Sequence, residues 1–503
     1  MKEPESAHAT DPKPVPKKRW RRFLRSGFLV FLVIYLLVVL YNIFKPLPAG
    51  IGMEGQIYSL NEDSIEFLYD LTYENENGEI VAEQQIFDRI LQMIEEAEDY
   101  ILLDMFLFDT QEDAFRDLST ELVDHLIQRK KQVPDIKFHI MTDMYNTLYG
   151  SVPNEALALL EKEGIPVSYS DMDRLRDSNF IYSGIWRIFF RIFGLPENFS
   201  HSGLIRVEGN SCSPRSLFKA LNSKANHRKI LVVDSGEVIQ SLVTSANPSA
   251  YGSKYSNVAI YMKETSNGIH KDIYESEKAI AAYSDEEFVE HEFLDIGADA
   301  VESGSNQLSV QFVTEGKIRE ALIEEFENVG SGDTIAVAMF LLTERTVVNS
   351  LVSASNRGAD IKIVVDPSKY LFGQDSKGVP NRPVMAELKD DSEGKIEIRW
   401  YNTHGEEFHS KTVLIAKDDG KVVVFLGSAN LTRRNIGDYN LEADVKLVGT
   451  QDSEVIQEFD DYFQRIWENR GGIYTVDYDE LDDDSWYRYS KYWLQERSGL
   501  CAW

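Results

Sequence analysis

The chain has 503 residues, of which 43% are hydrophobic and 11% aromatic, so it is long enough for two or three domains and too apolar to be disordered as a whole. Its formal net charge is −31, although residues 1–49 hold nine Lys and Arg against three Asp and Glu. Because nucleic-acid binding gains most of its affinity from Lys and Arg on phosphates, we expect no nucleic-acid partner for this acidic body, unless a local basic groove provides one.

The chain contains two cysteines, Cys212 and Cys501, which lie far apart and lack the spacing of metal ligands. We therefore expect no metal or other cofactor. The spacing leaves open whether the two thiols pair in a disulfide.

A long uncharged segment lies near the N-terminus. Nineteen residues separate Arg25 from Lys45, and a helix of that length, at about 1.5 Å per residue, nearly crosses a hydrocarbon core of ~30 Å. We predict a disordered basic tail over residues 1–24 and a membrane-spanning helix over residues 25–45, with a cleaved signal peptide or a buried core helix as alternatives. Basic residues crowd the N-terminal side, so the positive-inside rule predicts a single-pass protein of the cell membrane with a cytoplasmic N-terminus and an extracytoplasmic body.

Beyond this segment the sequence repeats itself. Residues 101–108 (ILLDMFLF) resemble residues 335–342 (IAVAMFLL), and an amphipathic helical stretch precedes each. In both halves a further helical run and a second apolar strand follow, and this strand ends at Asp143 or at Asp366. Strands that alternate with helices predict an α/β fold with a largely parallel sheet in each half.

The first half carries an insertion. It runs 84 residues from Asp143 to His227, whereas the second half runs 43 from Asp366 to His409. We place the extra residues near 170–215. Within them, IYSGIWRIFFRIFGLP combines aromatic residues with two arginines, which is typical of a helix in a bilayer interface or, alternatively, of a cap over the domain core.

One polar motif occurs in each half: a His-x-Lys that begins a strand, a turn, and a second strand that ends in Ser-Ala-Asn. Side chains at positions i and i+2 of a strand project to the same side, so each His and Lys share one surface. The two copies consist of His227, Lys229, Ser245 and Asn247, and of His409, Lys411, Ser428 and Asn430.

These residue types suit the chemistry of a phosphodiester. The lysines, asparagines and serines would bind the phosphate oxygens. One imidazole would attack phosphorus while the other protonates the departing alcohol, and this reaction requires no metal.

The duplicated pattern H-x-K-x(4)-D followed by G-S-x-N resembles the phospholipase D superfamily over roughly residues 60–470. The second half, with GEEFHSK and FLGSANLTRRNIGDYNLEADV, resembles its phospholipase and cardiolipin synthase branches. The resemblance implies two similar α/β/α sandwich domains related by a pseudo-twofold axis, with both histidines in one pocket and a covalent phosphohistidine intermediate. We expect these domains over residues 60–265 and 305–470, followed by an acidic and aromatic tail over residues 471–503.

The two copies differ in their carboxylates. Asp234 follows His227 at the family spacing, whereas Ala416 takes that place after His409 and Asp418 lies two residues later. Thr244 also replaces the glycine of the pattern. The resemblance therefore predicts a supporting role for Asp234 and leaves open whether Asp418 substitutes for it in the second motif.

Glu442 resembles the family carboxylate that orients the histidine of its own motif, here His409, and Ala259 occupies the matching position in the first half. By similarity we assign His227 as the nucleophile and His409 as the general acid and base. A carboxylate beside His409 would favour the reverse order, because it would raise the basicity of that imidazole.

Three further residues lie near the second motif or its strands. His404 and Glu407 are expected either to contact the substrate or to belong to a plain loop, and Asp366 is expected to cap a turn rather than to face the cleft.

The sequence thus predicts a membrane-anchored phosphodiesterase of the phospholipase D type, with a phospholipid substrate and the bilayer as partners. It would hydrolyse or transfer phosphatidyl groups, and cardiolipin synthase activity, which uses the same pocket, is an alternative. Two further alternatives are a nuclease of the same superfamily and an inactive membrane scaffold, which Ala416 and Thr244 suggest. The oligomeric state does not follow from the sequence.

Overall fold

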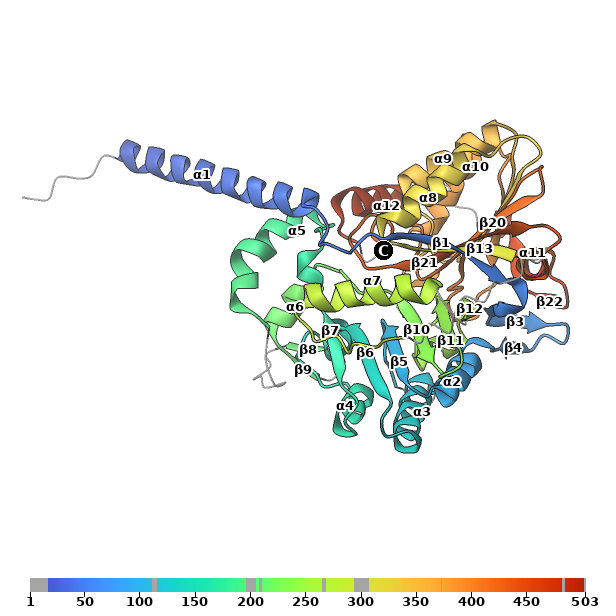
Figure 1. Cartoon of the computed structure of the whole chain (residues 1–503). Helices are drawn as coiled ribbons and strands as arrows, with labels where there is room; N and C mark the ends of the chain where they lie inside the picture. Colours follow the sequence, from blue (N-terminus) through green and yellow to red (C-terminus); the bar gives the residue numbers. More distant parts are fainter. Residues whose placement is uncertain are drawn as a thin grey trace, which may run out of the picture.

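The computed structural model describes residues 17–110, 115–195, 205–207, 210–264, 268–293, 307–371, 373–481 and 485–501. Two large mixed sheets share one apolar core between their facing sides, helices cover their outer sides, and one long helix projects from the body (Figure 1). The chain is therefore an α/β protein with an N-terminal apolar helix, as predicted.

The first half forms a seven-stranded sheet. In sheet order its strands are β2 (Ile65–Tyr69), β12 (Val258–Glu264), β11 (Ile239–Thr244), β10 (Lys229–Asp234), β5 (Tyr100–Met105), β6 (Lys137–Asp143) and β7 (Val167–Ser170). Its outer face packs on α2 (Ile86–Glu96), α3 (Leu118–Gln132) and α4 (Glu155–Lys162), whose apolar residues recur at helical spacing.

The second half forms a nine-stranded sheet. Its order is β1 (Glu54–Asn61), β13 (Gln307–Thr314), β21 (Ala443–Thr450), β20 (Lys421–Gly427), β19 (Lys411–Ala416), β14 (Thr334–Met339), β15 (Asp360–Val365), β18 (Glu397–Tyr401) and β23 (Thr475–Asp477). The outer helices are α8 (Gly316–Glu327), α9 (Arg345–Asn356) and α10 (Asn381–Asp391). The run from β13 to β18 repeats the order of the first sheet, which relates the two halves by a pseudo-twofold axis.

One helix of each half lies on the inner side and touches both sheets. α7 (Ile269–Ser284) contacts β7 of its own half and β13 of the other, and α11 (Glu454–Glu468) contacts β23 of its own half and β2 of the other. Each half is thus a helix–sheet–helix sandwich, and the inner helices help to join the two halves.

Most neighbouring strands are antiparallel, so the predicted largely parallel sheets are wrong. In the two sheets as described, β5, β6 and β7 run parallel, as do β14, β15 and β18. The motif strands β10 and β19 instead lie antiparallel to β5 and β14, and each continues through a short turn into β11 or β20. A short turn forces its two strands antiparallel, and this hairpin occupies the middle of each sheet.

Smaller elements surround the sheets. A third sheet joins β22 (Gly472–Ile473), β3 (Leu71–Asn75) and β4 (Ile80–Glu83). Two-stranded pairs are formed by β8 (Ile205–Val207) with β9 (Asn210–Cys212), and by β16 (Tyr370–Leu371) with β17 (Gln374–Asp375). Cys212 and Cys501 are both buried, and they form no disulfide in the described part of the chain.

The N-terminal helix α1 (Lys17–Phe44) contains a stretch, Trp20–Phe44, that is long and apolar enough to cross a membrane. Its helix begins within the tail that we expected to be disordered, because KKRWRRFL contains good helix formers and no breaker. It ends shortly before Pro46, which disfavours helical geometry in the preceding residue. The rest of the predicted tail, residues 1–16, lies outside the described residues.

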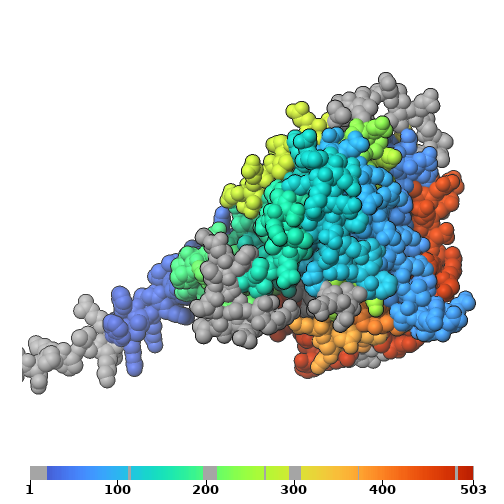
Figure 2. Space-filling model, turned by 90° about the horizontal axis from the view of Figure 1, so that it is seen from below, coloured from blue at the N-terminus to red at the C-terminus, as the bar shows by residue number. Residues whose placement is uncertain are grey.

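The insertion packs against α1 (Figures 1 and 2). It contains α5 (Phe180–Ile185), one π-helical turn (Trp186–Phe190), a 3₁₀ turn (Arg191–Phe193) and α6 (Pro214–Ala220). The Tyr35 hydroxyl donates to the carbonyl of Ile181, and a Cβ at Gly184 would collide with the Tyr35 ring. Close contact between this segment and α1 therefore requires glycine at position 184.

The C-terminal tail forms α12 (Trp486–Ser498), which packs beside α10. Tyr492 is buried on its inner side, whereas Trp486, Tyr487 and Trp493 are exposed. The acidic residues 482–484 lie outside the described residues.

Arg228, the middle residue of the first His-x-Lys, joins the two halves. Its guanidinium lies 2.9 Å from Glu277 of α7 and 2.6 Å from Glu315, the residue before α8, and all three side chains are fully buried. Glu315 in turn accepts the backbone N–H of Glu442 at 3.1 Å. A charge removed from this triad leaves buried carboxylates uncompensated.

We predict that Arg228→Met lowers the free energy of unfolding by about 3–5 kcal/mol, the usual cost of breaking a buried ion pair from one side. Chemical denaturation of the detergent-solubilised chain measures this change. Arg470→Met is the control, because Arg470 pairs with Glu468 on the surface and its loss should leave the denaturation midpoint unchanged. Equal midpoints for both variants would contradict the prediction.

Candidate active site

The two His-x-Lys motifs meet where the halves join. The backbone N–H of His227 donates to the carbonyl of Leu441 in the second half, at 2.9 Å, and that of Ser256 donates to the carbonyl of Glu407, at 3.3 Å. Parallel bridges pair Asn226 with Leu441 and Ser256 with Phe408, so residues next to each histidine contact the opposite half and the two motifs lie close together.

Glu442 pairs with His227, not with the histidine of its own motif. His227 Nδ1 lies 2.9 Å from Glu442 Oε2, and the Ser428 hydroxyl donates to the same oxygen at 2.6 Å. Our expectation that Glu442 orients His409 is therefore wrong. We assigned Glu442 to His409 because both lie in the second half of the sequence. The pseudo-twofold axis instead brings this second-half carboxylate to the first-half histidine.

Asn257 holds His409 in the same manner. His409 Nδ1 lies 3.0 Å from Asn257 Oδ1, which also accepts the Ser245 hydroxyl at 3.1 Å. Ser245 and Ser428 each accept the N–H of the residue that follows the orienting group, Val258 and Ala443. Asn257 is thus the counterpart of Glu442, and the first-half loop between serine and partner is two residues shorter, so alignment by a constant offset pointed to Ala259.

The serine hydroxyls therefore donate their hydrogen bonds to other groups of the protein. Ser245 and Ser428 fix Asn257 and Glu442 behind the histidines, so we revise the phosphate-binding role that the sequence predicted for them. Both orienting oxygens accept hydrogen bonds, which assigns the proton of each imidazole to Nδ1. The Nε2 atom of each ring is then left with its lone pair for chemistry.

An aromatic ring accompanies each motif. The Phe106 and His227 ring centroids are 5.1 Å apart, and so are those of Phe340 and His409, with the same interplanar angle of 56°. Lys229 and Lys411 lie over these phenylalanine rings and donate to the carbonyls of His227 and His409. We did not single out the two phenylalanines from sequence, although both stand in the repeated MF of ILLDMFLF and IAVAMFLL.

Asn247 and Asn430 each lie three residues beyond the second strand of a motif hairpin, β11 or β20. The side-chain oxygens of both amides are buried, and neither has a hydrogen-bond partner among the described residues. Buried amide atoms normally find partners, and in this exception the two asparagines are again equivalent in the two halves.

Two buried carboxylates fix the residue before each histidine. Asp143 accepts the N–H of Asn226 at 2.7 Å, and Asp366 accepts that of Phe408 at 2.9 Å. Asp366 also accepts the N–H of Ser368 and so caps the turn as predicted. The sequence showed both aspartates at the ends of repeated strands but did not reveal that they anchor the motifs.

Asp234 lies at the far end of β10 from His227, about 20 Å away at the rise of an extended strand. It accepts from His291 Nε2 at 2.8 Å and from the Gly236 N–H in the turn. Asp418 lies in the corresponding turn of the second half, where its N–H donates to Asp333. The structure therefore brings neither aspartate to the pocket, and the loss of this position in the second motif does not alter the pocket.

His404 and Glu407 differ in their placement. The His404 ring lies 3.7 Å from Glu406 and from Glu74, away from the motif histidines. Glu407 is buried and bonds to Tyr255, whose ring lies 5.7 Å from that of His409. Of the two, Glu407 is the one that borders the site.

Burial controls the protonation of the site. It lowers the pKa of His227 to about 4 against the opposing effect of Glu442, and together with Lys411 and Lys229 it holds the pKa of His409 well below 6.5. Burial also lowers the pKa of Lys229 to about 7. Burial alone would raise the pKa of Glu442, but His227, Lys229 and the Ser428 hydrogen bond outweigh it and keep this pKa below its usual value.

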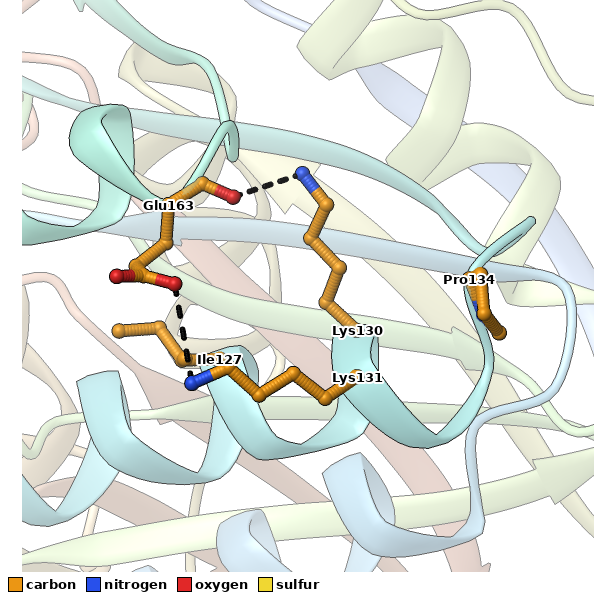
Figure 3. A pocket seen from close by; sticks show the side chains of 5 residues that line it. All are labelled: Ile127, Lys130, Lys131, Pro134 and Glu163. Atoms are coloured by element: carbon orange, nitrogen blue, oxygen red, sulfur yellow. Dashed lines mark hydrogen bonds and ion pairs between the residues drawn. The ribbon is translucent and has the colours of Figure 1, made fainter.

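A surface pocket between α3 and the loop after α4 lies apart from this site (Figure 3). Its two cations are engaged, since Lys130 Nζ donates to the Glu163 carbonyl and Lys131 lies 3.7 Å from the Glu163 carboxylate. We assign it a structural role. Among the described residues, no group of three or more His, Cys, Asp or Glu side chains is arranged to hold a metal.

The chain is similar to known proteins in part of its sequence and in its fold. Residues 322–467 match a family model described as cardiolipin synthase, PLD-like domain. The solved phosphatidylserine synthase of Haemophilus influenzae Rd KW20 aligns over 88% of this chain and 94% of its own, with a TM-score of 0.53 and 12% identity, which shows a common fold. The search of curated proteins gave no match.

Two further solved structures align more loosely. Polyphosphate kinase from Porphyromonas gingivalis covers 80% of this chain and 50% of its own, with a TM-score of 0.44 and 15% identity. Nuc, a phospholipase D family member from Salmonella typhimurium, covers 34% of this chain and 98% of its own, with a TM-score of 0.26 and 22% identity.

The burial of neutral His227 predicts a pH dependence of stability. Between the pKa of about 4 in the folded chain and about 6.5 in the unfolded chain, the unfolded chain binds more protons. The stability that neutral His227 contributes is fully present above pH ~6.5 and is lost as the pH falls to ~4. This loss lowers the free energy of unfolding by about 3 kcal/mol at most. The free energy of unfolding should therefore fall less steeply over this range in His227→Gln than in the wild type. His125→Gln, on the partly exposed face of α3, is the control, and parallel curves for wild type and His227→Gln would disprove the prediction.

Proposed function

We propose that this chain, whose residues 322–467 match a cardiolipin synthase, PLD-like domain, is a membrane-anchored enzyme of the phospholipase D superfamily that transfers the phosphatidyl group of a glycerophospholipid, through a phosphohistidine, to an alcohol or to water. The observation that carries this proposal is the pair of buried histidines, each oriented through Nδ1 and each accompanied by a buried lysine. We expect the side-chain N–H groups of Asn247 and Asn430, which follow the two motif hairpins, to donate to the phosphate oxygens.

In the first step, His227 Nε2 attacks phosphorus, a P–N bond forms, and the bond from phosphorus to the headgroup oxygen breaks. The Glu442 carboxylate supports His227 in this role, because it stabilises the positive charge that the imidazole gains. His409, whose partner is the neutral amide of Asn257, is the better proton donor of the two. We therefore keep the order that similarity suggested.

The proton balance depends on the substrate. Burial and the two lysines favour a neutral His409. A bound phosphodiester brings a negative charge that offsets Lys229 and Lys411, so His409 gains a proton at Nε2 and donates it to the leaving alkoxide. In the second step the acceptor gives its proton back to His409 and attacks phosphorus, and the P–N bond breaks.

The acceptor is the finer part of the proposal. The matched family model carries the description cardiolipin synthase, which favours an alcohol on a second lipid as acceptor. Water would give phosphatidic acid in the same pocket. An acidic body offers no support for a nucleic-acid substrate.

The anchor and its direction belong to the same proposal. Trp20–Phe44 is exposed over most of its length, and 11% of its most apolar stretch is buried, as suits a helix in lipid. Basic residues precede it and Lys45 alone follows it closely, so we place the N-terminus in the cytoplasm and the site outside it. The substrate then lies in the leaflet that adjoins the body.

We predict that the purified chain converts phosphatidylglycerol in mixed vesicles to cardiolipin or to phosphatidic acid, and that His227→Ala and His409→Ala each reduce the rate by at least about 10²-fold. Mass spectrometry of the extracted lipids measures both products. His125→Ala is the control, because His125 lies on the outer helix α3. Equal turnover by all four proteins, or none by the wild type alongside cleavage of DNA in a parallel assay, would refute the lipid activity.

The order of the histidines has its own test. Acid quenching during turnover of lipid labelled in its phosphate should trap the label on His227, and the label should accumulate in His409→Ala if a good leaving group makes the general acid dispensable in the first step. Peptide mapping locates the labelled residue. Label on His409 in the wild type would reverse the assigned roles.

A further inference from the structure

Residues 180–193 of the insertion pack beside the middle of α1 rather than beside its end. Tyr35 contacts Gly184, and the Phe31 and Phe189 ring centroids are 6.1 Å apart. Tyr35 precedes Lys45 by ten residues, which corresponds to about 15 Å along a helix, or half of a ~30 Å hydrocarbon core. A segment that touches α1 at this level lies at a depth occupied by lipid.

The outer surface of this segment is apolar. Ile192 is 74% exposed and Phe193 60%, whereas most apolar residues of the two large sheets are buried. A cap over the domain core would turn these side chains inward. The exposed apolar residues of the segment are Phe180, Ile181, Ile185, Phe189, Ile192 and Phe193.

Both arginines of the segment lie beside carboxylates, although the Arg191 side chain stays 53% exposed and the buried Trp186 Nε1 has no hydrogen-bond partner among the described residues. Arg187 pairs with Asp177 at 2.7 Å, with both side chains buried, and Arg191 lies 3.5 Å from Asp173. The backbone is helical throughout, first as α5, then as a π turn, then as a 3₁₀ turn. Helical backbone and neutralised charges are what the hydrocarbon region demands of any segment within it.

We propose that residues 180–193 form a membrane-embedded wedge that enters the leaflet adjoining the body, alongside α1, without crossing the bilayer. The occupant of its apolar surface is lipid acyl chain. This inference rests on the proposed anchor, because the depth of the wedge is measured along α1. The wedge would seat the body on the bilayer at a fixed height, in addition to tethering it.

Fluorescence quenching by lipids that carry a nitroxide on the acyl chain tests the wedge in vesicles of phosphatidylcholine and phosphatidylglycerol. Three variants of the full-length chain each receive one exposed thiol for a fluorescent label: Ile192→Cys on the wedge, Val33→Cys on α1, and Leu159→Cys on α4 of the body. The wild type measures background labelling, since Cys212 and Cys501 are buried.

We expect the labels at positions 192 and 33 to be quenched several-fold more than the label at position 159. Quenching at 33 but not at 192 would overturn the wedge and leave the anchor intact. A contact between labels at position 192 of different chains that disappears when unlabelled protein is added would also overturn the wedge. In that case a second copy of the chain would cover this surface. No quenching at 33 would remove the anchor and the wedge together. None of these readouts depends on lipid turnover, so a failure of the proposed activity is seen separately.

Discussion

The site depends on one constraint: each motif histidine takes its orienting partner from the opposite half of the chain. His227 is held by Glu442, and His409 by Asn257. Neither half alone can therefore build a competent imidazole. The apolar core shared by the two sheets and the buried Arg228 triad both hold the halves in the register that these two hydrogen bonds need.

The same exchange makes the two motifs unequal on an almost equal scaffold. The phenylalanine rings, the lysines, the supporting serines and the anchoring aspartates recur in both halves, and the phenylalanine–histidine geometry agrees to the ångström. The two motifs differ in the group that orients the histidine, which is the Glu442 carboxylate for His227 and the Asn257 amide oxygen for His409. A carboxylate stabilises an imidazolium far better than an amide does, and this difference supports the proposed assignment of His227 as nucleophile and His409 as acid.

The sequence predicted the α/β class, the repeat, the apolar helix and the motifs, because these rest on local patterns. It missed what depends on the meeting of the halves. A constant offset matched Glu442 to Ala259, since the two-residue difference between the loops is invisible without the hydrogen bonds of Ser245 and Ser428. Spacing alone likewise gave Asp234 a place in the site, whereas the direction of β10 carries it to the far end of the strand.

The insertion links α1 to the two motifs through buried ion pairs. Asp177 binds Arg187, which belongs to the wedge segment, and at 2.5 Å Lys224, which stands three residues before His227. Arg434, in the loop after Ser428 and Asn430, donates to the carbonyls of Asn222 and Ser223 and so ties the second motif to the same stretch. A helix tethered only at its end would leave the body free to tilt. Because these contacts join the segment beside α1 to both motifs, the fold fixes the position of the motifs relative to α1.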